Sequence, residues 1–298
     1  MQQTLSLDLA DLGQWTEKRP LAFRLACLWA KYAPRARGWL PRQLGRAFCR
    51  EMRCFIRTRA GGKLAVDPSS LDFYSLVETR RGVWEEDVLD ACLKALRPED
   101  VFYDIGANAG ILTVDIAQTF HDALTIHAFE PQPTLARSIA VSVALNGFRN
   151  VHLHETLLGD QEGEMQLFIP EHAIHASMVS RQAGATAVTC RIERLDALVA
   201  RGVLPAPTVI KIDVEGAEIA VLRGALATLR TAPPAVIFEA DDNMVRFGHT
   251  HRDLFELLTG AGEYTFYRIE GRRWQEVADA SRAEYGNYVA WPRARPAP

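Results

Sequence analysis

The sequence predicts an α/β fold with a doubly wound, mainly parallel sheet, because strand-like and helix-like segments alternate from residue 100 onward. Short apolar runs such as VFYDI (101–105) and VIKID (209–213) have the length and composition of buried strands. Runs such as TLARSIAVSVALNG (134–147) have helical character and end at a glycine. Alternation of this kind places helices on both faces of a parallel sheet.

The individual segments follow from the hydrophobic period and from the turn residues between them. We expect helices over 84–96, 111–120, 134–147, 216–229 and 251–262. We expect strands over 101–105, 124–130, 151–158, 164–169, 186–192, 209–213 and 235–240, and a closing pair over 264–271 and 287–292. The closing pair has no clear helix between its members, so we expect it to pair antiparallel at one edge of the sheet.

The first sixty residues differ from the rest of the chain in charge. They contain 12 Lys and Arg against 4 Asp and Glu, a balance of +8, and the remaining 22 basic and 33 acidic residues give −11, which together make −3. Leu40, Leu44, Phe48 and Met52 recur at helical spacing, which predicts helices in this region. We therefore divide the chain into a basic helical extension over 1–80, which could act as an acceptor-binding lid, and a main domain over 81–298.

The basic extension allows two interpretations. Its helices could pack against the main domain with a solvated basic face, or they could bind an anionic surface such as a lipid-linked or carrier-bound acceptor. No apolar run approaches the roughly 20 residues of a membrane span, and no signal-peptide pattern opens the chain. Five cysteines without a CxxC pair predict free thiols in a reducing compartment. We expect a cytoplasmic protein that could associate peripherally with the inner face of a membrane.

The stretch VFYDIGANAG (101–110) predicts a ligand site at the end of the first main strand. Gly106 and Gly110 allow a tight turn and close approach of the backbone to a ligand. Glu130 ends the next strand, where a carboxylate can bind both hydroxyls of a ribose. The spacing is DxGxNxG and not the GxGxxG of dinucleotide sites, and Asp104 would repel a pyrophosphate. The motif therefore favours a positively charged nucleoside such as S-adenosylmethionine, with a dinucleotide as the alternative.

Beyond this motif the chain resembles the FkbM-type methyltransferases, which use S-adenosylmethionine and have the class I methyltransferase fold. The resemblance extends from about Gly82 to Pro292 and leaves out the basic N-terminal residues. It rests on VFYDIGANAG, HAFEPQP, NGFRNVHLHETLLGDQEGEMQLF, CRIERLDAL and IKIDVEGAEIAVLRGA, in this order. It implies a Rossmann-like, mainly parallel seven-stranded sheet with an antiparallel terminal strand pair.

The resemblance also implies the residues of a cofactor site, taken position by position. The methionine end would lie against Asp104, Gly106, Asn108 and Gly110. The ribose would bind Glu130 beside Pro131, and the adenine would lie near Leu158, Gly159 and Asp160. Asp213 would lie close to the methyl group, and Glu85 would face the cleft.

Known members of the family mostly methylate hydroxyl groups on sugars, glycans, glycolipids or polyketides, so the resemblance implies a small-molecule or glycan acceptor with a free hydroxyl. An alcohol needs a base, and the candidates are Asp213, Glu215, Glu239, His172 and His175, of which strand position favours Asp213, then Glu239. A magnesium site on Asp213, Glu239 and Asp241 is a less favoured alternative.

Three function classes remain open from the sequence. The favoured one is O-methylation with S-adenosylmethionine. The others are a dinucleotide-dependent oxidoreductase and a non-catalytic scaffold that binds the cofactor. The acidic main domain has no basic stripe through the predicted cleft, so we expect no nucleic-acid partner.

Overall fold

The computed structural model describes residues 12–32, 40–41, 43–44, 53–67, 70–169, 186–279 and 283–296. His172 and His175, two of the candidate bases, lie outside these described residues, as do Phe48 and Met52 of the predicted N-terminal helices.

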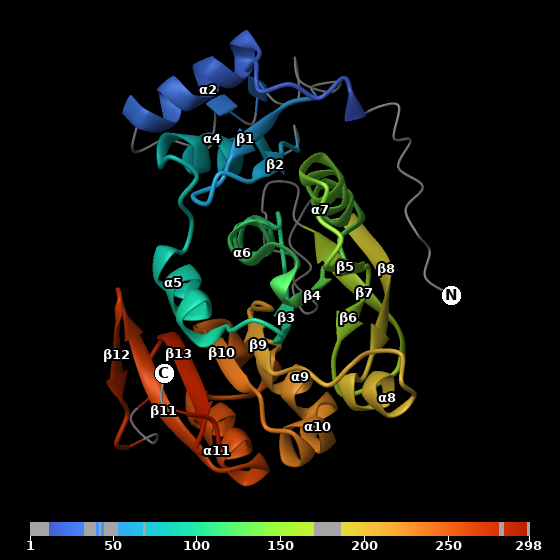
Figure 1. The fold of residues 1–298 in the computed structure, drawn as a ribbon, viewed down its shortest axis with the longest axis vertical. Helices are drawn as coiled ribbons and strands as arrows, with labels where there is room; N and C mark the ends of the chain where they lie inside the picture. Colours follow the sequence, from blue (N-terminus) through green and yellow to red (C-terminus); the bar gives the residue numbers. More distant parts are fainter. Residues whose placement is uncertain are drawn as a thin grey trace.

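The centre of the molecule is an eight-stranded sheet in the order β12-β11-β13-β10-β9-β3-β4-β5 (Figure 1). Five neighbouring strands are parallel: β5 (Val151–His154), β4 (Thr125–Phe129), β3 (Val101–Ile105), β9 (Val209–Ile212) and β10 (Ala235–Ala240). Three further strands are antiparallel: β13 (Gly286–Pro292), β11 (Tyr264–Glu270) and β12 (Arg273–Glu276). The predicted α/β class and antiparallel closing pair are confirmed, and β12 adds an eighth strand to the expected seven.

The strand order reverses between β3 and β9, which makes the sheet doubly wound. On one face, Phe102 and Ile126 pack with the buried residues of α5 (Glu86–Ala95) and α6 (Ile111–Phe120). On the other face, Tyr103 and Ile105 pack with α9 (Glu218–Gly224), α10 (Leu226–Thr231) and α11 (His251–Ala261). Successive strand residues point to opposite faces, so one strand contributes to both cores.

The remaining helices connect and cover these strands. They are α7 (Pro133–Asn146), α8 (Leu195–Ala200) and the short 3-10 helices η2 (His121–Ala123) and η3 (Asp242–Phe247). Helix α7 ends at Gly147 in the left-handed conformation, as the sequence predicts. The helix expected over 216–229 is wrong in its extent, because α9 ends at Gly224 and α10 begins at Leu226.

A second, three-stranded sheet lies beside the main one. Its order is β6-β8-β7, with β6 (Leu157–Leu158), β7 (Gly163–Ile169) and β8 (Thr186–Glu193). The single strand expected over 151–158 is therefore wrong: β5 pairs with β4, whereas β6 pairs with β8. The Thr156 hydroxyl donates to the carbonyl of Arg191 at 3.0 Å where the chain changes sheets.

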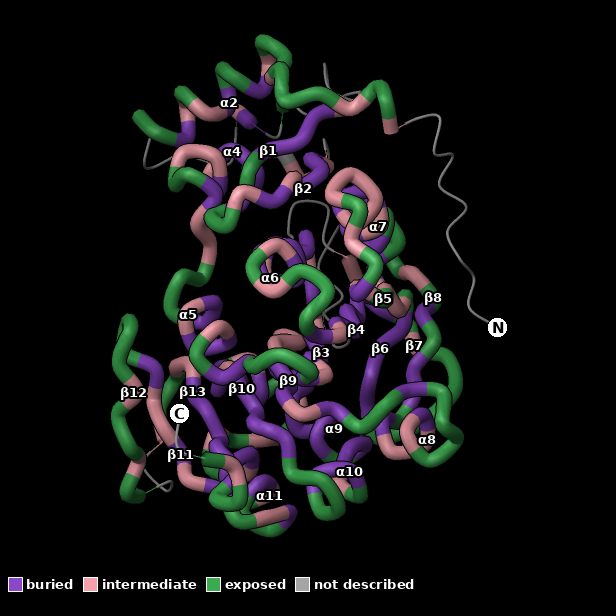
Figure 2. The backbone as a smooth tube through the Cα atoms, viewed as in Figure 1, coloured by how far each residue is buried: buried purple, intermediate pink, exposed green. Residues whose placement is uncertain are grey.

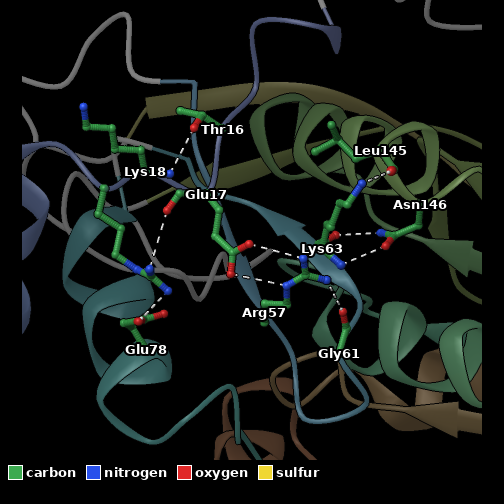
Figure 3. Close-up of polar contacts among 10 residues, drawn as sticks. Thr16, Glu17, Lys18, Arg57, Gly61, Lys63, Glu78, Leu145 and Asn146 are labelled. Atoms are coloured by element: carbon green, nitrogen blue, oxygen red, sulfur yellow. Dashed lines mark hydrogen bonds and ion pairs between the residues drawn. The ribbon is translucent and has the colours of Figure 1, made fainter.

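The N-terminal part contains helix α2 (Leu21–Tyr32), a hairpin of β1 (Phe55–Arg57) and β2 (Lys63–Ala65), and helix α4 (Leu71–Thr79). The helix expected up to residue 60 is wrong over Phe55–Arg57, because these residues pair with β2. Figure 3 shows how the hairpin is held: the Lys63 amine donates to the carbonyl of Leu145 at 3.1 Å, and its backbone exchanges hydrogen bonds with the Asn146 side chain.

This N-terminal part shares a hydrophobic core with the main domain. Phe23 of α2, Ile56 of β1 and Leu64 of β2 form one buried cluster with Val114 of α6. The core explains why the extension lies against α6 and α7 in Figure 1. The domain boundary at residue 80 stays a prediction. Within the described ranges, no helix is long and apolar enough to cross a membrane.

Candidate functional site

A cavity of about 350 Å³ opens at the carboxyl ends of the parallel strands, beside the reversal of strand order. Parallel sheets bind ligands at this edge, because the loops that follow neighbouring strands diverge there. Residues at the ends of the parallel strands, in the second sheet and in segments outside both line the cavity. They are Phe73, Trp84, Glu85, Ile105, Gly106, Asn108, Phe129, Glu130, Pro131, Gln132, Thr156, Leu157, Leu158, Leu167, Asp213, Val214, Glu215, Ala217, Glu239, Asp241, Asn243 and Tyr285.

The turn after β3 forms the floor of this cavity. Gly106 has φ +80°, and a Cβ built on it would lie 1.9 Å from the carbonyl oxygen of Asp213. Its N–H and that of Ala107 both donate to the carbonyl of Phe129 at 3.0 Å. Asn108 has φ +54° and donates its N–H to Glu130 Oε2 at 2.8 Å. The glycine is needed here because two strand ends touch through backbone atoms.

Glu130 is buried and held from two sides. Its second oxygen, Oε1, accepts the N–H of Gln132 at 2.9 Å. Burial raises the pKa of Glu130 to about 7, although the two backbone N–H groups oppose the shift. The carboxylate therefore has a fixed orientation beside the cavity.

Lys211 of β9 lies between two carboxylates, Asp213 at the edge of the cavity and Asp104 behind it. Its amine lies 3.2 Å from Asp213 Oδ2 and 3.8 Å from Asp104 Oδ1, and it donates to the carbonyl of Gly106 at 3.3 Å. Burial alone would lower the pKa of Lys211, but Asp213, Asp104 and Glu85 hold it above its usual value. Lys211 is therefore a buried salt-bridge residue that connects the ends of β3 and β9.

Asp104 is fully buried, and the hydroxyl of Thr113 donates to its Oδ2 at 2.6 Å. Burial raises the pKa of Asp104 despite the neighbouring lysine. This aspartate therefore supports the turn and Lys211 from behind the cavity.

Glu239 and Tyr285 form the opposite wall of the cavity. Burial raises the pKa of Glu239 to about 7. The hydrogen bond with Tyr285 lowers this pKa, whereas the negative charge of Asp213 raises it further. That hydrogen bond, in turn, raises the pKa of Tyr285 to about 12. A smaller cavity of about 150 Å³ is also lined by Glu239 and Tyr285, together with Glu85 and Asp213. Glu239 thus faces both spaces.

The loop after β9 is held by Glu218 at the start of α9. Its Oε1 accepts the N–H groups of Val214 at 3.0 Å and Gly216 at 3.2 Å. Gly216 has φ +100°, and a Cβ on it would lie 2.7 Å from the backbone of Asn243. Burial raises the pKa of Glu218 to about 7. Glu218 shapes the loop that carries Asp213 to the cavity edge.

The structure brings most of the residues expected from the sequence to one cavity. Those that line it are Glu85, Gly106, Asn108, Glu130, Pro131, Leu158, Asp213, Glu215, Glu239 and Asp241. The other four do not line it: Asp104 is buried behind the turn, Gly110 is the N-cap of α6, Gly159 donates its N–H to the carbonyl of Glu193, and Asp160 is exposed.

Several lining residues carry no signal in the sequence. Phe73 reaches the cavity from α4, Trp84 from the connection between α4 and α5, and Tyr285 from the segment before β13. Their rings are far along the chain from the glycine motif, and neither segment matches a known binding pattern. The signal that could have identified Tyr285 is its position beside a strand that neighbours β10.

The carboxylates considered for magnesium are already engaged. Asp241 accepts the backbone N–H of Asn243 at 3.0 Å and its side-chain amide at 2.6 Å. In the part of the chain that the structure describes, no group of three or more His, Cys, Asp or Glu side chains could hold a metal ion. The magnesium alternative on Asp213, Glu239 and Asp241 stays a prediction.

Comparison with known proteins gives a family for this arrangement. The model of the methyltransferase FkbM domain matches residues 104–266, more than half of the chain. The hexuronic acid methyltransferase AglP of Haloferax volcanii is 29% identical over 178 residues, which cover 59% of this chain and 69% of that protein.

Solved structures of methyltransferases are also similar, though only weakly. The methyltransferase FkbM from Methylobacillus flagellatus has a TM-score of 0.46 at 16% identity, and the match covers 75% of this chain and 53% of that one, so this chain spans about half of its length. An S-adenosylmethionine-dependent O-methyltransferase from Thermotoga maritima has a TM-score of 0.38 at 14% identity, over 81% of this chain and 78% of that one. The family assignment rests on the family model.

Proposed function

This chain belongs to the FkbM methyltransferase family and has the class I methyltransferase fold, and from this premise we propose that it transfers a methyl group from S-adenosylmethionine to a hydroxyl oxygen of a sugar or glycan. One observation carries the proposal: the described lining of the cavity contains six carboxylates and no Lys or Arg. Such a cavity favours a ligand with positive charge and disfavours a pyrophosphate. The family does not support the dinucleotide-dependent alternative.

The residues present fit S-adenosylmethionine, whose sulfur is positively charged. Gly106 and Asn108 would approach the methionine end, because their backbone forms the floor of the cavity. Glu130, fixed by two N–H groups, would accept hydrogen bonds from the ribose hydroxyls. Pro131 and Leu158, with Phe129 and Leu157, would offer an apolar wall to the adenine. Gly159 and Asp160 follow directly after that wall, whereas Asp104 and Gly110 would support the site from behind.

Bound S-adenosylmethionine supplies a methyl group already activated for displacement by oxygen. The protein must then align the acceptor hydroxyl and remove its proton. Alignment can contribute about 7–11 kcal/mol, and a base about 10²–10⁴ in rate. The sequence favours Asp213 as this base, but Asp213 is ion-paired with Lys211 at 3.2 Å. We therefore assign the base to Glu239, whose pKa of about 7 suits it to accept a proton near neutral pH.

Asp213 keeps an electrostatic role in this proposal. Its carboxylate lies at the cavity edge with Glu85, where both would attract the positive sulfur. The acceptor would enter from the side of Glu239 and Tyr285, two residues that also line the smaller cavity. The sugar assignment is supported by the relative from Haloferax volcanii, which is named a hexuronic acid methyltransferase.

The test is methyl transfer to sugar acceptors, neutral and uronic, followed by mass spectrometry of the product. We expect an O-methylated sugar, and a rate that rises with pH through an apparent pKa at or below about 7, because the base must be deprotonated and a nearby cation lowers its pKa. Glu239→Gln should lower the rate about 10²–10⁴-fold and remove this pH limb, with S-adenosylmethionine affinity retained.

Asp242→Asn is the matched control, because Asp242 begins η3 shortly after the strand of Glu239, has 81% of its side chain exposed and does not line the cavity. It should leave the rate and the pH profile unchanged. Methylation of nitrogen or carbon would overturn the O-methylation proposal, and a pH limb that persists in Glu239→Gln would overturn the assignment of the base. Calorimetry with S-adenosylmethionine and with NAD tests the cofactor separately.

A further inference from the structure

The outermost helix of the N-terminal part, α2, carries apolar side chains on both of its faces. Phe23, Ala26 and Ala30 are buried against the rest of the molecule. On the outer face, Leu21, Leu25, Leu28 and Tyr32 are 69%, 43%, 54% and 70% exposed. Their spacing of four, three and four residues forms one continuous line along a helix. We call these four residues the α2 stripe. Figure 2 shows the exposed outer side of this helix at the end of the molecule.

The α2 stripe is unusual for this protein. A surface helix normally turns charged and polar residues outward, opposite its buried face. Seven large hydrophobic residues are strongly exposed in the described part of the chain, and four of them form the α2 stripe. Of the other three, Tyr285 lines the cavity, and Val203 and Val245 are isolated in other segments. A concentration of this kind indicates a surface that is covered by another body.

The charges around the α2 stripe indicate which body covers it. Arg24 and Lys31 are exposed on the same helix, and α2 contains no Asp or Glu. The first sixty residues of the sequence, which include α2, carry a formal charge of +8. In a symmetric dimer through this face, two basic surfaces would meet and repel each other. An anionic lipid surface offers both apolar depth for the leucines and negative charge for the basic residues.

We propose that α2 binds the surface of an anionic membrane, with the α2 stripe inserted at the boundary between headgroups and acyl chains. The helix has 12 residues and lies along the surface of the molecule, so it would lie in the plane of the membrane. Attraction between the basic side chains and the anionic headgroups would add to the binding free energy that comes from burying the leucines. This inference concerns a surface outside the cavity and does not depend on the acceptor.

The position of α2 links this surface to the cavity. Phe23 of α2 and Phe73 of α4 belong to one buried cluster, and Phe73 also lines the cavity. A bound membrane would therefore be separated from the cavity by the packing layer between α2 and α4. For the acceptor this favours a sugar carried on a lipid, a consequence that rests on the proposed function.

The test is co-sedimentation of the full chain with vesicles of roughly equal parts phosphatidylcholine and phosphatidylglycerol, without cofactor or acceptor. We expect binding that weakens as salt rises and is largely lost on vesicles of phosphatidylcholine alone. Leu25→Ser with Leu28→Ser should weaken binding about tenfold, because two leucines lose their insertion. Val203→Ser with Val245→Ser, two exposed residues elsewhere, should bind as the wild type does.

Three results would overturn the proposal. The first is that the wild-type protein does not bind the vesicles even at low salt. The second is that it binds neutral and anionic vesicles equally well. The third is that the leucine substitutions do not change binding. Light scattering tests whether a second copy of the chain covers the α2 stripe instead. A wild-type protein that is dimeric, and that the leucine substitutions make monomeric, would assign the α2 stripe to a dimer interface. Thermal unfolding of both variants checks that the fold is retained, and the wild-type salt and lipid series needs no variant. If the protein does not bind vesicles, the proposed methyl transfer is unaffected, because its test uses sugar acceptors in solution without vesicles.

Discussion

At the scale of single residues, Gly106 shows how a short motif acts through the backbone. A side chain at this position would need φ near +80° and would place its Cβ 1.9 Å from the carbonyl oxygen of Asp213. Gly106→Ala should therefore separate the ends of β3 and β9 and weaken S-adenosylmethionine binding at least tenfold, with a loss of stability beyond the roughly 1–2 kcal/mol of left-handed strain. Calorimetry and urea unfolding measure the two effects.

Gly147→Ala is the control for that strain. Gly147 has φ +69° at the end of α7, and a Cβ there would meet nothing within 4 Å. It should lose stability by the strain alone and keep its cofactor affinity. Equal behaviour of the two variants would contradict a special role for the contact between Gly106 and Asp213.

Single residues also show where sequence reasoning ends. The glycine motif identifies Gly106 and Asn108 because their type and spacing are unusual, and both line the cavity. Asp213 follows β9 and Glu239 lies near the carboxyl end of β10, so their place at one sheet edge is predictable. Lys211 and Asp213 are two residues apart, so the period of a strand turns both side chains to one face, where the structure pairs them at 3.2 Å. Tyr285 is not predictable, since its segment has no motif.

At the scale of elements, the neighbouring strands β4 and β5 carry a histidine pair that sets a pH dependence. His127 Nδ1 lies 3.0 Å from His154 Nε2, a hydrogen bond that needs one neutral donor and one acceptor. Burial, with the neighbouring histidines, lowers the pKa of His127 to about 3 and that of His154 to about 4. An unfolded histidine has a pKa of about 6.5. The unfolded state therefore binds more protons between about pH 4 and 6.5.

From this sign it follows that the pair destabilises the fold as pH falls below 6.5, by up to about 1.4 kcal/mol per pH unit for each histidine. Buried Glu130 and Glu218, whose pKa values are raised, act in the opposite direction, so the comparison must be between variants. His154→Gln should flatten the loss of stability from pH 6.5 to 4.5 in urea unfolding. His249→Gln, a loop substitution, should not, and an identical slope in all three proteins would disprove the assignment.

At the scale of the whole molecule, the N-terminal part and the main domain unfold together if their shared core is the main link. Ile56 of β1 is fully buried in a cluster with residues of α2, α4 and α6. Ile56→Ala should lower the free energy of unfolding by about 2–5 kcal/mol through a single urea transition, because it leaves a cavity in that core. Leu28→Ala, at a residue 54% exposed, should change it little. Two transitions, with only the first one shifted, would show that residues 1–80 unfold on their own.

The sequence by itself determined the alternation of strands and helices, the antiparallel closing strands and the glycine turn with its carboxylates, because hydrophobic period and turn chemistry are local properties. Tertiary structure alone decided that β5 and β6 enter different sheets, that Phe55–Arg57 pairs as a strand, and that Phe73, Trp84 and Tyr285 meet at the cavity. These features depend on which distant segment is available as a partner. Pairing between distant segments is a property of the whole packed chain, and no window of neighbouring residues contains it.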